Sequence, residues 1–156
     1  MAEDRIEVQR RIEAEPHVIF SLLCDPHGHV RIDSSGMLME AEGEPVSAVG
    51  DSFVVHMDRE ALGDLPLGHY DVTVTITAFE PDREIAWTVE GVVRPGIGHV
   101  YGYRLEPVED GTLVTSYCDW STIDDSWRQA AIFPVISAGA LRATLGILDR
   151  SVTRGG

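Results

Sequence analysis

The sequence predicts an α+β fold in which a curved, seven-stranded antiparallel sheet wraps around one long C-terminal helix. Two observations lead to this expectation. Much of the chain before residue 120 alternates between apolar and polar residues, and residues 126–152 then carry an apolar stripe at helical spacing. The residues of that stripe are Pro134, Ala138, Leu141, Leu145, Leu148 and Val152. A helix with so many apolar residues must pack against a large apolar surface, and the preceding strands are the only part of the chain large enough to provide it.

The N-terminal part is predicted to form one strand and two short helices. Residues 5–13 alternate in polarity, which is typical of a half-buried strand. Pro16 favours the start of a helix that ends near Asp25. A second short helix or turn is expected over 27–33, followed by turn-forming residues at 33–36.

The remaining six strands are expected to follow one another as a meander. They are predicted at 37–43, 52–57, 70–79, 85–89, 99–105 and 112–120. In the third of these, valine and isoleucine take one face, and threonine and aspartate take the other. The pair Asp110-Gly111 suits a tight hairpin turn before the last strand. No repeat or linker interrupts the pattern, so residues 1–156 are predicted to be a single domain.

Composition predicts a globular chain with a substantial interior. Of the 156 residues, 44% are hydrophobic, which argues against disorder. A chain of this length can bury about 70% of the surface that its unfolded form exposes, enough for a core and a cavity. No apolar run reaches the roughly 18 residues that a membrane-spanning helix needs, so membrane insertion is not expected.

Charge and cysteine content narrow the environment and the partners. A net charge of −14 at pH 7 repels phosphate backbones and anionic headgroups, so neither nucleic acid nor a membrane surface is an expected partner. The acidic N-terminus lacks the basic and apolar regions of a signal peptide, and we expect a cytoplasmic protein. Cys24 and Cys118 have no metal or redox spacing and are expected to be reduced and buried.

Several short motifs, in their order and spacing, resemble the START and polyketide cyclase/dehydrase (SRPBCC) superfamily. They are Ala14–Pro16, Asp33–Gly36, Gly50–Phe53, Phe79–Trp87, Tyr103–Pro107 and Tyr117–Trp120. The resemblance covers nearly the whole chain and implies a helix-grip fold with an apolar cavity between sheet and helix. Members use that cavity for lipids, hormones, polyketides and other small hydrophobic ligands. The resemblance implies no particular reaction, since fold does not determine function.

Strand parity predicts which side chains line such a cavity. The residues expected to contact a ligand are Phe53, Met57, Tyr70, Val74, Trp87, His99, Tyr101, Tyr103, Leu141 and Leu145. Core packing is the alternative for the apolar ones. The polar members need hydrogen-bond partners when buried, and a ligand could supply them. If the protein is an enzyme, His99, Tyr101 and Tyr103 are the candidates for acid/base catalysis.

Other polar residues leave alternatives open. Arg10 has the parity of the apolar face, so it must pair with an acid, reach solvent or bind an anionic ligand group. Asp33 and Asp119 are either rim partners for the cavity or solvated turn residues. On the last helix, Ser137 and Thr144 offer hydroxyls on the inner side. Gly139 and Gly146, seven residues apart on one face of that helix, indicate close backbone contact or simple tolerance.

Metal and loop candidates are weaker. The cluster His27-Gly28-His29 lies near two aspartates, but its spacing differs from that of common zinc sites, and surface histidines at a helix end explain it equally well. No metal or cofactor is expected. The glycine-rich segments 58–69 and 91–98 are either gates to a binding site or plain surface turns.

The leading functional hypothesis is a cytoplasmic binding protein for a small hydrophobic or aromatic ligand held between the sheet and the C-terminal helix. The alternative is a polyketide cyclase, aromatase or dehydratase acting in the same cavity. An interaction module is disfavoured, because threonines such as Thr73 and Thr75 make the outer sheet face polar. The sequence leaves a homodimer open.

Overall fold

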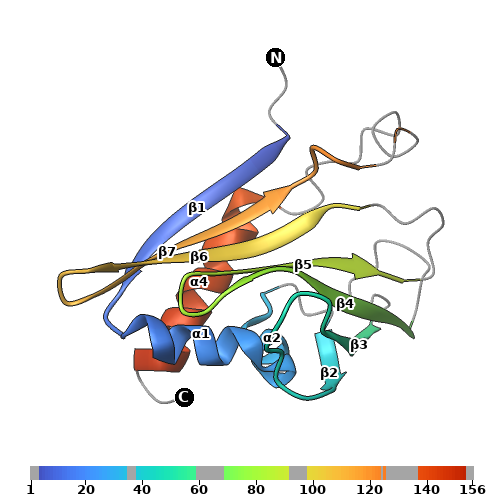
Figure 1. Ribbon diagram of the computed structural model, residues 1–156, viewed down its shortest axis with the longest axis horizontal. Helices are drawn as coiled ribbons and strands as arrows, with labels where there is room; N and C mark the ends of the chain where they lie inside the picture. The colour runs from blue at the N-terminus through green and yellow to red at the C-terminus, as the bar shows by residue number, and fades with distance from the viewer. Residues whose placement is uncertain are drawn as a thin grey trace.

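The computed structural model describes residues 4–34, 38–58, 69–91, 98–123, 125 and 137–153. Its seven strands form one antiparallel sheet in the order β1-β7-β6-β5-β4-β3-β2, which curves around the C-terminal helix (Figure 1). The predicted fold class and the six-strand meander are therefore confirmed. The first strand, β1, lies at one edge of the sheet and pairs with the last strand, β7.

The element boundaries lie close to those expected. They are β1 (Arg5–Ile12), α1 (Pro16–Cys24), α2 (Pro26–Ile32), β2 (Leu38–Glu42), β3 (Ser52–Asp58), β4 (His69–Glu80), β5 (Glu84–Glu90), β6 (Val100–Val108), β7 (Gly111–Asp119) and α4 (Ala138–Thr153). The prediction of one unbroken helix over 126–152 is wrong at Ser137, which is not helical and precedes the first residue of α4, while residues 126–136 lie outside the described residues. No helix in the described ranges is long and apolar enough to cross a membrane.

Local sequence signals set the start of both short helices. Pro16 is the first residue of α1, where a missing N–H is harmless because the first N–H groups of a helix have no intrahelical acceptor. Asp25 precedes α2, and its carboxylate accepts the backbone N–H of His27 at 3.0 Å. A cap of this kind typically stabilises a helix by about 1 kcal/mol.

Helix α4 lies against one face of the sheet, where it contacts β1 and β7, and it also contacts α1 and α2 (Figure 1). Its stripe residues Leu141, Leu145 and Leu148 are buried in the main core. Burying a leucine fully is worth about 1.5 to 3 kcal/mol, so this stripe secures the helix. The sheet also borders a cavity, which is lined by residues of β3, β4, β5, β6 and β7.

Arg10 of β1 pairs with an acid on α4. Its Nε lies 2.7 Å from Asp149 Oδ2, and the arginine side chain remains 48% exposed. Arg10 therefore both pairs with an acid and reaches solvent, and its charge lies at the edge of the helix–sheet interface. An exposed pair of this kind contributes little, at most about 1 kcal/mol.

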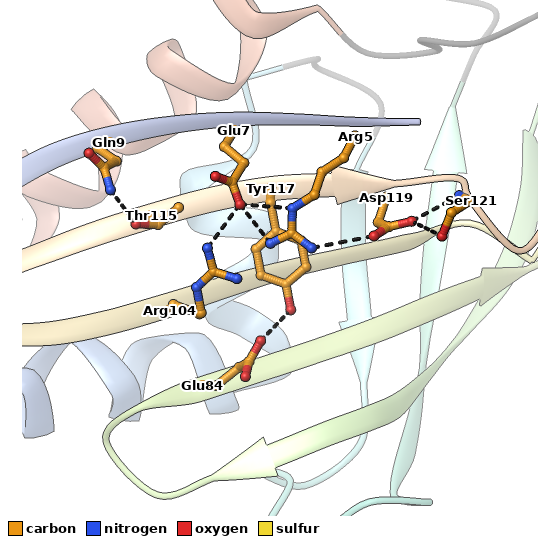
Figure 2. Close-up of polar contacts among 9 residues, drawn as sticks. All are labelled: Arg5, Glu7, Gln9, Glu84, Arg104, Thr115, Tyr117, Asp119 and Ser121. Atoms are coloured by element: carbon orange, nitrogen blue, oxygen red, sulfur yellow. Dashed lines mark hydrogen bonds and ion pairs between the residues drawn. The ribbon is translucent and has the colours of Figure 1, made fainter. Parts of the chain in front are cut away.

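The opposite face of the sheet carries a polar network around Tyr117 (Figure 2). The Arg5 guanidinium lies 4.0 Å from the centre of the Tyr117 ring, and that of Arg104 lies 5.2 Å from it. The Tyr117 hydroxyl donates to Glu84 Oε2 at 2.6 Å. Both arginines also donate to Glu7, so the tyrosine joins β1, β5, β6 and β7 on this face.

A glycine allows the Tyr117 ring to lie across strand β6. A Cβ atom on Gly102 would lie only 2.3 Å from Tyr117 Cζ. We expect Gly102→Ala to lower the free energy of unfolding by about 2 kcal/mol, because the ring must move away from its partners. Urea unfolding measures this change. In a Tyr117→Ala background the same substitution should cost much less, and an equal cost in both backgrounds would contradict the contact.

Candidate ligand-binding cavity

A cavity of about 290 Å³ lies between the sheet and helices α2 and α4. Among the described residues, its lining consists of Leu23, His29, Ile32, Asp33, Ser34, Leu38, Val55, Met57, Tyr70, Val72, Val74, Trp87, Val89, His99, Tyr101, Gly102, Tyr103, Ser116, Tyr117, Leu141 and Thr144. Most of these side chains are apolar or aromatic. The volume is close to the lower end of the range for small-molecule sites.

Most of the residues predicted to contact a ligand lie on the wall of this cavity. Those that line the cavity are Met57, Tyr70, Val74, Trp87, His99, Tyr101, Tyr103 and Leu141. Phe53 and Leu145 are buried in the core but are not among its lining residues. The ring of Phe53 instead contacts the ring of His29, at a centroid distance of 5.0 Å, and it is His29 that lines the cavity.

His29 is a buried, neutral histidine in the cavity wall. Its Nε2 lies 2.7 Å from the Leu23 carbonyl oxygen, and because a carbonyl can only accept, this nitrogen carries the hydrogen. The ring also packs against Trp87 at 4.6 Å. Burial lowers the His29 pKa to about 4. The neutral ring therefore has its remaining nitrogen, Nδ1, as an acceptor.

His99 and Tyr101 form an edge-to-face pair at the start of β6. Their ring centroids are 5.1 Å apart, and both residues line the cavity. Burial lowers the His99 pKa to about 4. It raises the pKa of the Tyr101 phenol, whose hydroxyl is hydrogen-bonded to the Cys118 thiol. Both groups are therefore uncharged at neutral pH.

Tyr103 completes the aromatic wall. Its ring stacks on Trp87 with centroids 5.8 Å apart and an interplanar angle of 28°. Its hydroxyl is hydrogen-bonded to Ser116, which faces it across the β6–β7 pair. Burial raises the Tyr103 pKa to about 12. This part of the wall offers a flat aromatic surface with hydroxyl groups beside it.

A second polar region lies where the α2–β2 connection meets α4. Ser34 Oγ lies 3.1 Å from the Ala140 carbonyl oxygen and 2.8 Å from Thr144 Oγ1. Asp33 Oδ2 accepts the Leu38 N–H at 3.2 Å. Ser34, Thr144 and Asp33 all line the cavity, so Asp33 lies where a rim partner would be.

The other polar candidates lie elsewhere. Asp119 is on the outer face, 3.3 Å from Arg5, and it also accepts from Ser121 (Figure 2). Ser137 Oγ accepts the Ala140 N–H at 3.1 Å and so caps α4. His27 is exposed, but the expectation that both histidines of that cluster lie at the surface is wrong, since His29 is buried in an aromatic cluster.

Metal ligands and gating loops were the remaining candidates. In the part of the chain that the structure describes, no group of three potential ligands is arranged to hold a metal ion. Both cysteines are buried free thiols, and burial raises the pKa of each. Most of the two glycine-rich segments, 58–69 and 91–98, lies outside the described residues.

Sequence reasoning missed His29, Ser34 and Ser116 as cavity residues. Ser116 could have been found, because Val114, Ser116 and Cys118 share a parity on the last strand, and Val114 and Cys118 are apolar. No comparable signal existed for Ser34, which lies in a turn. The short helix α2 likewise gave no sequence signal that the side chain of His29 would point inward.

A curved sheet that clasps a helix around an apolar cavity defines a helix-grip protein. The sequence agrees with this class, because the model of the family described as polyketide cyclase / dehydrase and lipid transport matches residues 3–153. The chain belongs to that family. No curated protein matches it.

Solved structures with the same fold are distant in sequence. Protein NE0264 from Nitrosomonas europaea is 14% identical, with a TM-score of 0.70, and the alignment covers 99% of this chain and 97% of that one. Protein CV1439 from Chromobacterium violaceum is 15% identical, with a TM-score of 0.67 and 96% of both chains covered. The Aha1 dimer from Colwellia psychrerythraea is 19% identical, with a TM-score of 0.63 and coverage of 99% and 98%. At these identities the similarity establishes the fold alone.

Proposed function

We propose that this protein binds a small hydrophobic or aromatic ligand in the cavity between its sheet and α4, and that it does so in the cytoplasm. The observation that carries the proposal is the cavity itself, whose wall combines aliphatic side chains with the stacked rings of Trp87 and Tyr103. Apolar cavities with a few converging polar groups are typical ligand sites. Membership of a family that includes lipid transport supports the same function.

Cavity volume indicates the size of the ligand. An apolar cavity of about 150 Å³ holds one benzene molecule. The cavity here, at about 290 Å³, is roughly twice as large. A two-ring aromatic molecule, or an aliphatic one of similar volume, therefore fits best.

The titratable groups favour binding over the cyclase, aromatase or dehydratase alternative. General acids and bases work best with a pKa near the working pH. Burial lowers the pKa of His29 and of His99 to about 4 and raises that of Tyr103 to about 12. All three pKa values move away from neutrality, so these side chains are better suited to orienting a ligand than to transferring its protons.

Native mass spectrometry of freshly purified protein tests the proposal. We expect a bound hydrophobic molecule that is released on denaturation, and the same spectrum reports whether the protein is a dimer. Binding of naphthalene, measured by equilibrium dialysis, supplies a defined probe. Absence of both a copurified molecule and naphthalene binding would refute the proposed function.

Filling the cavity should block this binding. Val89 lines the cavity, whereas Thr88, its neighbour in β5, faces the other side of the sheet. We expect Val89→Trp to weaken naphthalene binding at least about tenfold, equivalent to 1.4 kcal/mol, because the indole occupies the same space. Thr88→Trp is the matched control and should leave the affinity within about twofold. Circular dichroism checks that both variants fold, and equal affinities would place binding outside this cavity.

A further inference from the structure

The Ser34 and Thr144 hydroxyls form one polar end of the cavity, which we call the Ser34–Thr144 end. Ser34 Oγ is within hydrogen-bond distance of two oxygens, the Ala140 carbonyl at 3.1 Å and the Thr144 hydroxyl at 2.8 Å. A carbonyl oxygen can only accept, so the single Ser34 hydrogen points to Ala140. Thr144 must therefore donate its own hydrogen to Ser34.

Among the described residues, this assignment leaves the Ser34–Thr144 end with acceptors only. Both hydroxyl hydrogens are used within the protein, while Thr144 Oγ1 keeps two lone pairs and Ser34 Oγ keeps one. The nearby Leu38 N–H is likewise used, since it donates to Asp33. Asp33 adds a carboxylate to the lining, and an ionised carboxylate is also an acceptor.

We propose that the bound ligand presents a hydrogen-bond donor, a hydroxyl or N–H group, to the Ser34–Thr144 end. This inference rests on the proposed function and names the chemistry of the ligand. A phenol or alcohol satisfies the lone pair that faces it. A carboxylate of the same carbon frame would place its oxygens against other acceptors and near the Asp33 charge, so it is rejected.

The opposite wall does not impose this selection. Tyr103 and Ser116 share a hydrogen bond between two hydroxyls, each able to donate or accept, and neutral His99 has one nitrogen of each kind. That wall accommodates a donor or an acceptor by rotating hydroxyl hydrogens. His29 Nδ1 is a further acceptor among the lining residues, so the double variant described below is needed to assign the selection to the Ser34–Thr144 end.

Three probes with one carbon frame test the inference. Naphthalene, 2-naphthol and 2-naphthoate are each measured by equilibrium dialysis at pH 7.5. We expect 2-naphthol to bind about two- to tenfold more tightly than naphthalene, the net value of one hydrogen bond. The ionised 2-naphthoate should bind more weakly than either. Equal or reversed affinities of naphthol and naphthalene would overturn the inference while leaving the proposed function intact. Failure of all three probes to bind would also overturn the inference, and together with the absence of a copurified molecule it would overturn the proposed function as well.

A double variant assigns the preference to its residues. Ser34→Ala with Thr144→Val removes both hydroxyls and changes side-chain volume little. We expect the ratio of the naphthol affinity to the naphthalene affinity to fall to one or below, since the ligand hydroxyl then has no acceptor there. The affinity for naphthalene itself should stay within about twofold of the unmodified protein's. Thr153→Val is the control, because Thr153 lies on the same helix and donates to Asp149 O outside the cavity. A naphthol preference that survives in the double variant would overturn the assignment.

Discussion

Replacing Gly28 by alanine is expected to lower the free energy of unfolding by about 3 kcal/mol. A Cβ atom at this position would lie 2.0 Å from the carbonyl oxygen of Leu22 and 3.0 Å from its carbonyl carbon. Those are backbone atoms of α1, so no side chain can rotate away, and α1 and α2 must move apart. The same movement displaces His29, the next residue, from the cavity wall.

Gly146 provides a matched control in another helix. Nothing lies within 4 Å of the Cβ that Gly146→Ala would add in α4. Alanine has the higher helix propensity, so this variant should gain up to about 1 kcal/mol of stability. The structure thus favours simple tolerance of glycine at this position over close backbone contact. Urea unfolding measures the change in the free energy of unfolding, which should be negative for Gly28→Ala and positive for Gly146→Ala. A similar small change at both positions would show that α1 and α2 are not packed closely.

Acid is expected to destabilise the protein between about pH 6.5 and pH 4. Burial lowers the pKa of His29 and of His99 to about 4 in the folded chain, while an unfolded histidine has a pKa near 6.5. Between these values the unfolded chain binds protons that the folded chain does not. The contribution of these two neutral histidines to the free energy of unfolding is therefore fully present above pH 6.5, and it declines as the pH falls toward 4. For fully buried His29 the loss is about 3 kcal/mol.

Two histidine variants separate this effect from other titrations. His29→Gln keeps an N–H donor for Leu23 but cannot titrate, so it should flatten the decline in stability measured by urea unfolding from pH 7 to pH 4.5. His56 is the contrast, because its hydrogen bonds to Asp71 and to Glu42 raise its pKa on the outer face of the sheet. Its contribution is greatest below the unfolded pKa and is lost as the pH rises through the folded value. His56→Gln should therefore steepen the acid decline, and the same slope in both variants would exclude buried histidine as the cause.

The secondary structure could be predicted because its signals are local. Pro16 and the Asp25-Pro26 pair mark where α1 and α2 begin, through backbone geometry and a cap that involve only adjacent residues. The strands were found from their period of two. The same period placed Trp87, Tyr101 and Tyr103 on the inner face, so most of the aromatic wall was predictable before any tertiary contact was known.

Helix and turn residues in the cavity were harder to predict. Parity placed Phe53 on the cavity wall, but the ring of His29, brought in by α2, contacts Phe53 and itself lines the cavity. Leu145 has the inward parity of α4 yet packs in the core and is not among the lining residues, while Leu141, one turn earlier, is. Periodicity gives the direction of a side chain but not the element that it meets.

The amino-acid sequence by itself determined the order of the elements, their inward faces and hence the apolar, aromatic character of the cavity, because these depend on spacing and turn chemistry over a few residues. Only the tertiary structure decided which polar groups meet there. Ser34 and Thr144 are 110 residues apart, and their hydrogen bond exists because α4 lies beside the end of α2. The direction of that bond, and with it the acceptor character of the Ser34–Thr144 end, depends on a carbonyl oxygen that no sequence pattern could have placed.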